Sequence, residues 1–209
     1  MPTDSSQLVE QVYRAFATTP YPGDGFLQGS FDGCEPQEAV APFVGKRDWT
    51  SLDSNFLEQH ADALSFMSEA ALRFFLPAYL VADVQDTLVT ADPVFHLTYG
   101  FHTVVLSLPV DGQTFNKHTG GDTLINPRRY GAASAKDYSR YRLAVFCREE
   151  AEAIVAYLQY MQPQRTDSAI AASLDDFWLD RAENAPTKAD LAEHLDREQA
   201  FLEAVSATT

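Results

Sequence analysis

Residues 68–84 read SEAALRFFLPAYLVADV and carry the strongest helical signal in the chain. Ser68 is a good helix cap, and Glu69 favours the positive end of a helix dipole. Large apolar residues recur along one broad face at helical spacing: Leu72, Phe75, Leu76, Tyr79, Leu80 and Val84. Because Phe74 and Val81 make the opposite face apolar as well, we expect neighbouring elements to surround this helix on most sides.

Apolar residues at helical spacing predict helices over most of the rest of the chain. Pro77 removes one backbone hydrogen bond within the central helix and predicts a kink there. Ser5 or Ser6 is expected to cap the first helix, and Trp49 to anchor the N-terminal half to the core. Helical spacing predicts further helices over residues 5–18, 36–44, 54–62, 92–99, 148–162 and 167–183, and a last one that begins at Pro186-Thr187.

Residues 101–137 interrupt the helical pattern. The run 101–110 alternates as in a strand, with Val104, Leu106, Leu108 and Val110 at every second position, although it could also continue a helix. Asp111-Gly112 is typical of a tight hairpin turn. Residues 111–137 are polar and have no periodicity, which favours a long loop that is functional or mobile.

These patterns together predict the fold class and the domain organisation. We expect a mainly α protein: a single-domain, bundle-like body of six or seven helices. A small β-hairpin or long loop is inserted around 101–137. The globular domain covers residues 1–185, and residues 186–209 form a C-terminal helical extension that docks on the body or on a second chain.

Composition restricts the classes of partner. The chain has 209 residues with 30 acidic and 15 basic side chains, a formal net charge of −15. This charge repels nucleic acid and anionic lipid, so we expect no nucleic-acid partner. The longest apolar run, 74–82, is too short to cross a membrane, and residues 1–20 lack the pattern of a signal peptide. Cys34 and Cys147 are expected to be unpaired thiols, so the sequence predicts a cytoplasmic protein.

Basic residues are concentrated in one segment. Residues 100–148 hold seven basic and three acidic side chains, against an acidic excess elsewhere. We call the candidate binding residues in this segment the cationic-aromatic segment: Arg128, Arg129, Tyr130, Lys136, Tyr138, Arg140, Tyr141 and Arg142. Arginine and tyrosine suit a phosphate, a carboxylate or an acidic protein surface. The alternative, which the acidic composition favours, is that these basic side chains pair with the protein's own acidic helices.

The residues with catalytic or metal-binding chemistry form no recognisable motif. His96, His102 and His118 match no zinc spacing, so we expect that these three histidines do not form a common site. Acidic residues in the glycine-rich loop 20–36 do not follow the calcium-loop pattern. Cys147 precedes a predicted helix beside Arg148 and is expected to be a cap residue more than a reactive thiol. We therefore expect neither a metal nor a cofactor.

The central helix also carries a resemblance. Residues 64–80, together with Trp49-x-x-Leu52 upstream and the segment 142–157, resemble an uncharacterised bacterial family known only as a domain of unknown function. Its signature is the helix sequence Phe-Leu-Pro-Ala-Tyr-Leu, and the resemblance covers about residues 8–180. Members often have paired cysteines in the early loop, where this chain has only Cys34 beside Glu35. The resemblance supports the helical fold and implies no activity.

The sequence therefore leaves three hypotheses for function. The leading one is a non-enzymatic acidic binding protein, similar to an immunity protein or antitoxin, that inhibits a basic protein partner. The alternative is a small-molecule or metal-dependent enzyme with a pocket near His96, His102, His118 and residues 128–142. The third is a structural subunit that dimerises through residues 187–206.

Overall fold

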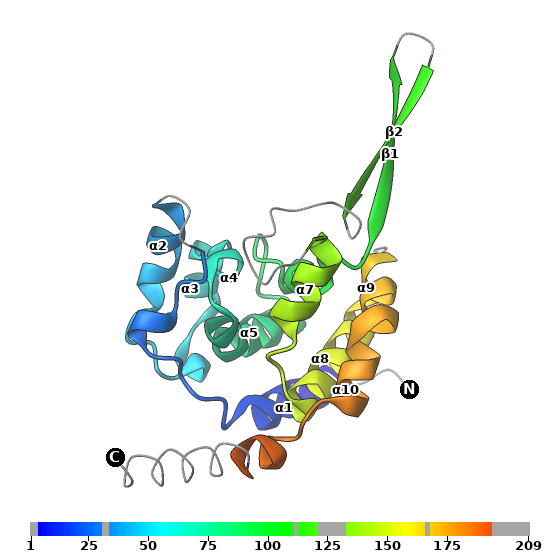
Figure 1. Ribbon diagram of the computed structural model, residues 1–209. Coiled ribbons are helices and arrows are strands. Elements are labelled where there is room, and N and C mark those ends of the chain that lie inside the picture. Colours follow the sequence, from blue (N-terminus) through cyan, green and yellow to red (C-terminus); the bar gives the residue numbers. More distant parts are fainter. Residues whose placement is uncertain (1–3, 31–33, 111–112, 121–132, 166–167, 194–209) are drawn as a thin grey trace, which may run out of the picture.

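The computed structural model describes residues 4–30, 34–110, 113–120, 133–165 and 168–193, and its body is helical (Figure 1). This confirms the mainly α class. Ten labelled α-helices lie in these ranges: α1 (Ser5–Phe16), α2 (Glu35–Val40), α3 (Ser54–Gln59), α4 (Ala63–Phe66), α5 (Glu69–Val84), α6 (Pro93–Thr98), α7 (Ala135–Leu143), α8 (Arg148–Met161), α9 (Ser168–Ser173) and α10 (Leu179–Asn184); a further helical stretch covers residues 188–193. Short 3₁₀ helices cover Asp24–Phe26, Ala41–Phe43 and Trp49–Ser51, and a π-helical segment covers Leu174–Trp178.

The number of helices exceeds the predicted six or seven for local reasons. The helix expected over 54–62 ends at Gln59, and α4 follows it as a separate turn. The helix expected over 167–183 contains the π-helical segment, which separates α9 from α10. Helix α7 was not predicted at all, because its sequence AKDYSRYRL buries only Ala135, Ser139 and Leu143 and so has no apolar stripe.

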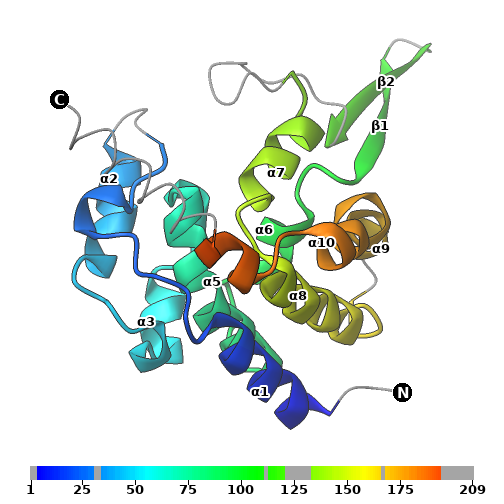
Figure 2. The same ribbon diagram turned by 60° about the horizontal axis from the view of Figure 1, so that its bottom comes forward.

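Helix α5 is the centre of the body, as its two apolar faces predict. Every residue from Phe74 to Ala82 is buried, Pro77 included, and α1, α3, α4 and α6 all contact it. Ser68 caps it as expected, since the hydroxyl accepts a hydrogen bond from the amide of Ala71 at 3.1 Å. Figure 2 shows α1 against α5 and α8, and α10 against α8. Trp49 is 5% exposed and stacks on Tyr13, in line with its predicted role as an anchor.

Two local predictions need correction. Asp4, not Ser5 or Ser6, caps α1, because its carboxylate accepts a hydrogen bond from the amide of Ser6 at 3.3 Å. The loop expected over 111–137 is also wrong in part, because residues 113–120 form a strand. That strand has no alternating apolar residues, so only its pairing with the preceding strand identifies it.

The two strands form an antiparallel hairpin that projects from the helical body (Figure 1). Strand β1 (Thr103–Val110) pairs with β2 (Gln113–Gly120), from Thr103 opposite Gly120 to Val110 opposite Gln113. Of the two structures considered for residues 101–110, a strand or a continued helix, the strand is the one observed, over Thr103–Val110. The expected turn residues Asp111 and Gly112 lie outside the described residues.

The beginning of the predicted C-terminal extension lies against the body. The backbone amide of Arg148 donates to the carbonyl of Pro186 at 3.0 Å, and the amide of Lys188 donates to the Glu149 carboxylate at 3.1 Å. The Lys188 ammonium donates to the hydroxyl of Thr18 at the end of α1, also at 3.1 Å. Residues 188–193 are helical, whereas the remaining stripe, Leu195, Leu202 and Val205, lies outside the described residues. The division into a domain and an extension stays a prediction.

Candidate functional site

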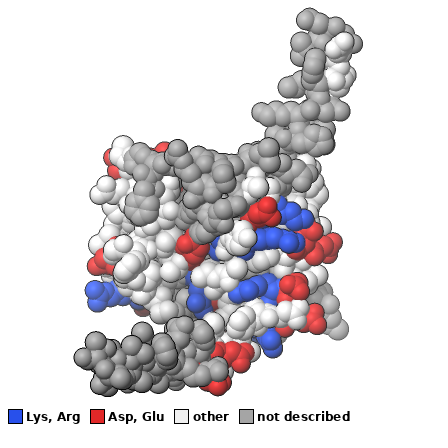
Figure 3. All heavy atoms as spheres, in the orientation of Figure 1, with Lys and Arg blue, Asp and Glu red and all other residues white. Residues whose placement is uncertain are grey.

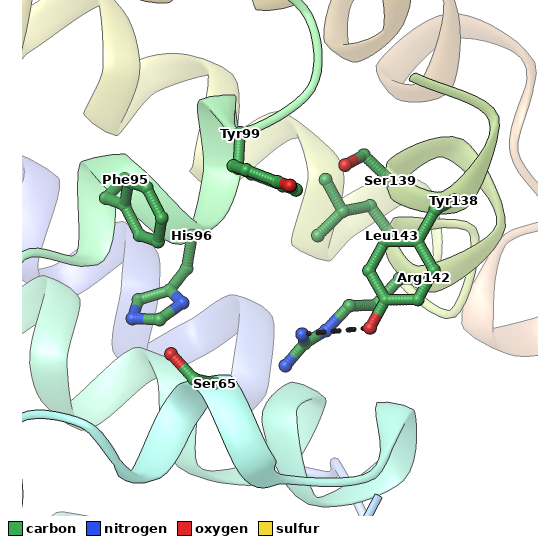
Figure 4. Close-up of a pocket in the computed structure, with 8 residues that line it drawn as sticks. All are labelled: Ser65, Phe95, His96, Tyr99, Tyr138, Ser139, Arg142 and Leu143. Atoms are coloured by element: carbon green, nitrogen blue, oxygen red, sulfur yellow. Dashed lines mark hydrogen bonds between the residues drawn. The ribbon is translucent and has the colours of Figure 1, made fainter. Parts of the chain in front are cut away.

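A pocket of about 280 Å³ lies between α4, α6 and α7 (Figure 4). Helix α4 contributes one residue to its lining, the α6 region three and α7 four: Ser65; Phe95, His96 and Tyr99; and Tyr138, Ser139, Arg142 and Leu143. The lining combines one guanidinium, one imidazole and several hydroxyls with aromatic rings. Such a mixture of a few polar groups and apolar walls is typical of small-molecule sites.

Glycine allows the two main walls of this pocket to approach each other. Gly100 ends α6 with a positive φ of +84°, a conformation that glycine adopts without strain. A Cβ atom at this position would lie only 2.6 Å from both the carbonyl oxygen of Ala135 and the hydroxyl of Ser139 in α7. Any larger residue would therefore push the α6 and α7 walls apart.

The π-helical segment Leu174–Trp178 is bonded to both walls. The indole N–H of the buried Trp178 donates to the carbonyl of Leu97 in α6 at 2.9 Å. On the other wall, the Lys136 ammonium lies 2.6 Å from the Asp176 carboxylate, and the Arg140 guanidinium donates to the Asp176 carbonyl at 2.8 Å. One short segment thus sets the positions of α6 and α7.

Arg142 and His96 lie on opposite sides of the pocket (Figure 4). The guanidinium of Arg142 donates through Nη2 to the carbonyl of Leu64, and through Nη1 to the hydroxyl of Tyr138 in a long hydrogen bond of 3.5 Å. Its Nε atom is buried and has no hydrogen-bond partner among the described residues. Arg142 therefore brings to the pocket a permanent positive charge and a donor that is not satisfied.

His96 is neutral at physiological pH. Burial, and then the positive charge of Arg142, lower the pKa of His96 to about 4, while Asp92 acts in the opposite direction. An uncharged imidazole has one donor and one acceptor nitrogen. Consequently Arg142 is the one charged side chain among the described residues that line the pocket.

The structure divides the cationic-aromatic segment between two faces of α7. Tyr138 and Arg142 line the pocket, whereas Lys136 and Arg140 bond to Asp176 of the protein's own C-terminal helices. The ring of Tyr141 is 57% exposed. Figure 3 shows basic side chains beside acidic ones on this face of the molecule. The other members of the segment, Arg128, Arg129 and Tyr130, lie outside the described residues.

The three histidines of the enzyme hypothesis are not seen to converge. His96 lines the pocket, while a ring nitrogen of His102 lies 3.2 Å from the hydroxyl of Ser168, at the start of α9. His118 belongs to β2, and its side chain is outside the description. Within the described ranges, no three His, Cys, Asp or Glu side chains gather closely enough to hold a metal ion.

Among the described residues, the most buried charged group has a structural role. The Glu150 carboxylate, 0% exposed, accepts hydrogen bonds from Arg73 at 2.7 Å, from the Thr19 hydroxyl at 2.6 Å and from the Cys147 amide at 3.1 Å. It thereby caps α8 and ties it to α5. Burial raises the pKa of Cys147 to about 11, so this thiol stays protonated at neutral pH and is a poor nucleophile.

Sequence reasoning missed much of the pocket lining: Ser65, Phe95, Tyr99, Ser139 and Leu143. One local signal could have found the α7 wall. Ser134 stands three residues before Asp137 and caps α7, accepting the Asp137 amide at 3.1 Å. A helix that starts there places Tyr138 and Arg142 four residues apart on one face.

Comparison with known proteins gives one match, to a family model described as Family of unknown function (DUF6714), over residues 4–182. The chain belongs to this family. The DUF6714 match includes every residue that lines the pocket and ends before the predicted extension. It confirms the resemblance to a family of unknown function, whereas a bacterial origin and a signature within α5 stay predictions.

Two further searches add no function to this DUF6714 member. Neither the curated proteins nor the solved structures gave a match. In the described part of the chain, no helix has both the length and the hydrophobicity that a bilayer crossing requires. Any proposal for function therefore depends on the pocket and on the surface charge.

Proposed function

We propose that this protein binds a small organic anion in the pocket between α4, α6 and α7. The observation that carries the proposal is the Arg142 guanidinium, which lines the pocket and whose buried Nε has no acceptor among the described residues. A buried donor left without a partner costs about 1–3 kcal/mol, and more when the group is charged. A carboxylate or phosphate oxygen in the pocket would pair with the positive charge of this guanidinium through a charge-assisted hydrogen bond.

The rest of the lining is consistent with recognition rather than catalysis. His96, with a pKa of about 4, is a weak proton acceptor at neutral pH. It can still donate or accept one hydrogen bond to a ligand. The hydroxyls of Ser65 and Ser139 offer further polar contacts, and Leu143 supplies an apolar surface. We therefore favour the small-molecule part of the enzyme hypothesis, without its metal.

Two arginines of the same helix provide a matched test. Arg142→Gln removes the charge from the pocket, whereas Arg140→Gln removes an equal charge that bonds to Asp176. In thermal-shift and NMR titrations against a panel of small carboxylates and phosphates, at least one anion should stabilise the wild type and the Arg140→Gln variant. The same anion should lose at least tenfold in affinity for Arg142→Gln. Equal affinities for both variants, or no bound anion at all, would overturn the proposal.

A second candidate is the acidic binding protein, a cytoplasmic inhibitor that captures a basic protein partner. A specific observation favours it. Several described basic side chains are already bonded within the protein: Arg73 to Glu150, Lys136 to Asp176, Arg165 to Asp83 and Asp92, and Arg181 to the carbonyls of Ala144 and Phe146. The net charge of −15 then favours fast association with a basic partner.

Salt and the pocket variant separate the two candidates. A basic partner captured through the acidic surface should associate more slowly as salt increases, and Arg142→Gln should leave that rate unchanged. An association rate that does not depend on salt would reject this second candidate.

A further inference from the structure

Resting on the proposed function of the pocket, we infer that its ligand is an aromatic monocarboxylate: one carboxylate attached directly or through a short link to an aromatic ring. Arg142 would hold the carboxylate, while Phe95 and Tyr99 would contact the ring. Three properties of the pocket support this choice over a phosphate, a neutral amide or a small aliphatic acid: its charge, the shape of its cation and its exposed aromatic rings.

The charge of the pocket matches a monoanion. Among the described residues that line it, Arg142 is the one basic side chain, and His96 stays neutral at pH 7. A phosphate monoester carries nearly two negative charges at this pH, and the second would find no partner inside the pocket. The net charge of −15 repels a dianion more strongly than a monoanion.

The shape of the cation favours a planar acceptor. A guanidinium presents its N–H groups in a flat fork that matches the two oxygens of a carboxylate. In Arg142 the Nη2 group donates to the carbonyl of Leu64 and the Nη1 group donates to the hydroxyl of Tyr138, whereas the buried Nε has no acceptor among the described residues. A neutral carbonyl could accept a hydrogen bond from this guanidinium, but it would leave the positive charge uncompensated.

The aromatic rings of the lining are left open to an apolar ligand. Phe95 is 50% exposed and Tyr99 is 42% exposed, although each belongs to α6 or its cap. Their ring centroids lie 5.5 Å apart with an interplanar angle of 51°, so the two rings form an angled aromatic wall on the α6 side of the pocket, with Phe95 beside His96 (Figure 4). A ligand ring that packs on this wall would cover apolar surface and gain aromatic contacts.

The volume limits the size of the ligand. At about 280 Å³ the pocket is close to the lower end of the range of about 300–1,000 Å³ that is typical of small-molecule sites. One aromatic ring with a carboxylate fits within this volume. A dinucleotide or a peptide of several residues would extend beyond it.

Four matched probes test the inference on the full chain: benzoate, phenyl phosphate, benzamide and acetate. At pH 7.5, ¹⁵N NMR titration should show benzoate binding at least tenfold more tightly than each of the other three. Benzoate should shift the amide signals of α6 and α7. Phe95→Ala should reduce the affinity for benzoate by a larger factor than the affinity for acetate, and its exposed side chain can be removed without opening the core.

The results distinguish the inference from the function on which it rests. If phenyl phosphate or acetate binds as tightly as benzoate at the α6–α7 signals, the pocket binds anions but the ligand class is wrong. If benzamide matches benzoate, the charge of the ligand is unimportant and the inference fails. If none of the probes shifts these signals, both the proposed function and the inference fall. The ranking of probes uses the wild-type chain, so it holds even if a variant does not fold.

Discussion

Lowering the pH from 7 to 5 should destabilise the protein through His96. In an unfolded chain the pKa of histidine is about 6.5. In the folded protein, burial and the charge of Arg142 lower the pKa of His96 to about 4. Between these two values the unfolded chain binds a proton that the folded protein does not bind. Stability is therefore at its full value above pH 6.5 and is lost as the pH falls toward 4.

The size of the effect follows from the same two pKa values. At pH 5 the unfolded histidine is almost fully protonated, whereas His96 in the folded protein is about nine-tenths neutral. Proton linkage then lowers the free energy of unfolding by up to about 2 kcal/mol between pH 7 and pH 5. Glu58 does not interfere in this range. Its pKa is lowered to about 2, chiefly by a hydrogen bond from Thr90, so its stabilisation is lost only below pH 4.5.

Urea unfolding at pH 7, 6 and 5 measures this loss in the wild type and in His96→Asn, which cannot titrate. The wild type should lose up to about 2 kcal/mol more than the variant. Arg142→Gln should show an intermediate loss, because the charge of Arg142 is the second cause of the lowered pKa. An NMR titration of the His96 ring gives the pKa directly. Equal losses in the wild type and in His96→Asn would refute the reasoning.

Other expected outcomes concern the core, the α6–α7 contact and the two thiols. Glu150→Gln should lower the free energy of unfolding in urea by about 3–5 kcal/mol, because it leaves Arg73 without its buried partner. Gly100→Ala should lose at least about 1–3 kcal/mol, whereas Gly25→Ala, with open space around it, should change little. Cys147, with a pKa of about 11, should react with a disulfide reagent at pH 8 far more slowly than the exposed Cys34; equal rates would contradict its burial.

Features that depend on neighbouring residues were predictable from the sequence. Ser68 was correctly predicted as a helix cap, because a cap contacts amides only two or three residues away. The apolar faces of α5 and the alternating apolar residues of β1 could also be recognised in the sequence. Helix α7 was not, because its buried face consists of small residues and its pattern is dominated by exposed charges.

Features that depend on long-range contacts could not be predicted. The basic composition of residues 100–148 pointed to Arg140 and Arg142 alike, and only the fold separates them. Arg140 bonds to Asp176, 36 positions away, whereas Arg142 lies opposite His96. His96 had been grouped with His102 and His118 by proximity in the sequence, but its partner in the pocket comes from a different helix.

The contacts of the π-helical segment favour testing ligand binding in the pocket before partner binding at the acidic surface. Three consecutive residues in it contact three different parts of the α6–α7 region: Asp176 bonds to α7, Phe177 stacks on Phe101 just before β1, and Trp178 bonds to α6. π-Helical turns are rare and frequently occur at functional sites. Asp176 holds Lys136 and Arg140 on one face of α7, and the pocket face is left to Arg142. Contacts with Asp176 therefore hold two cations on one face of α7, the charge of Lys136 being paired with its carboxylate, while Arg142 lines the pocket.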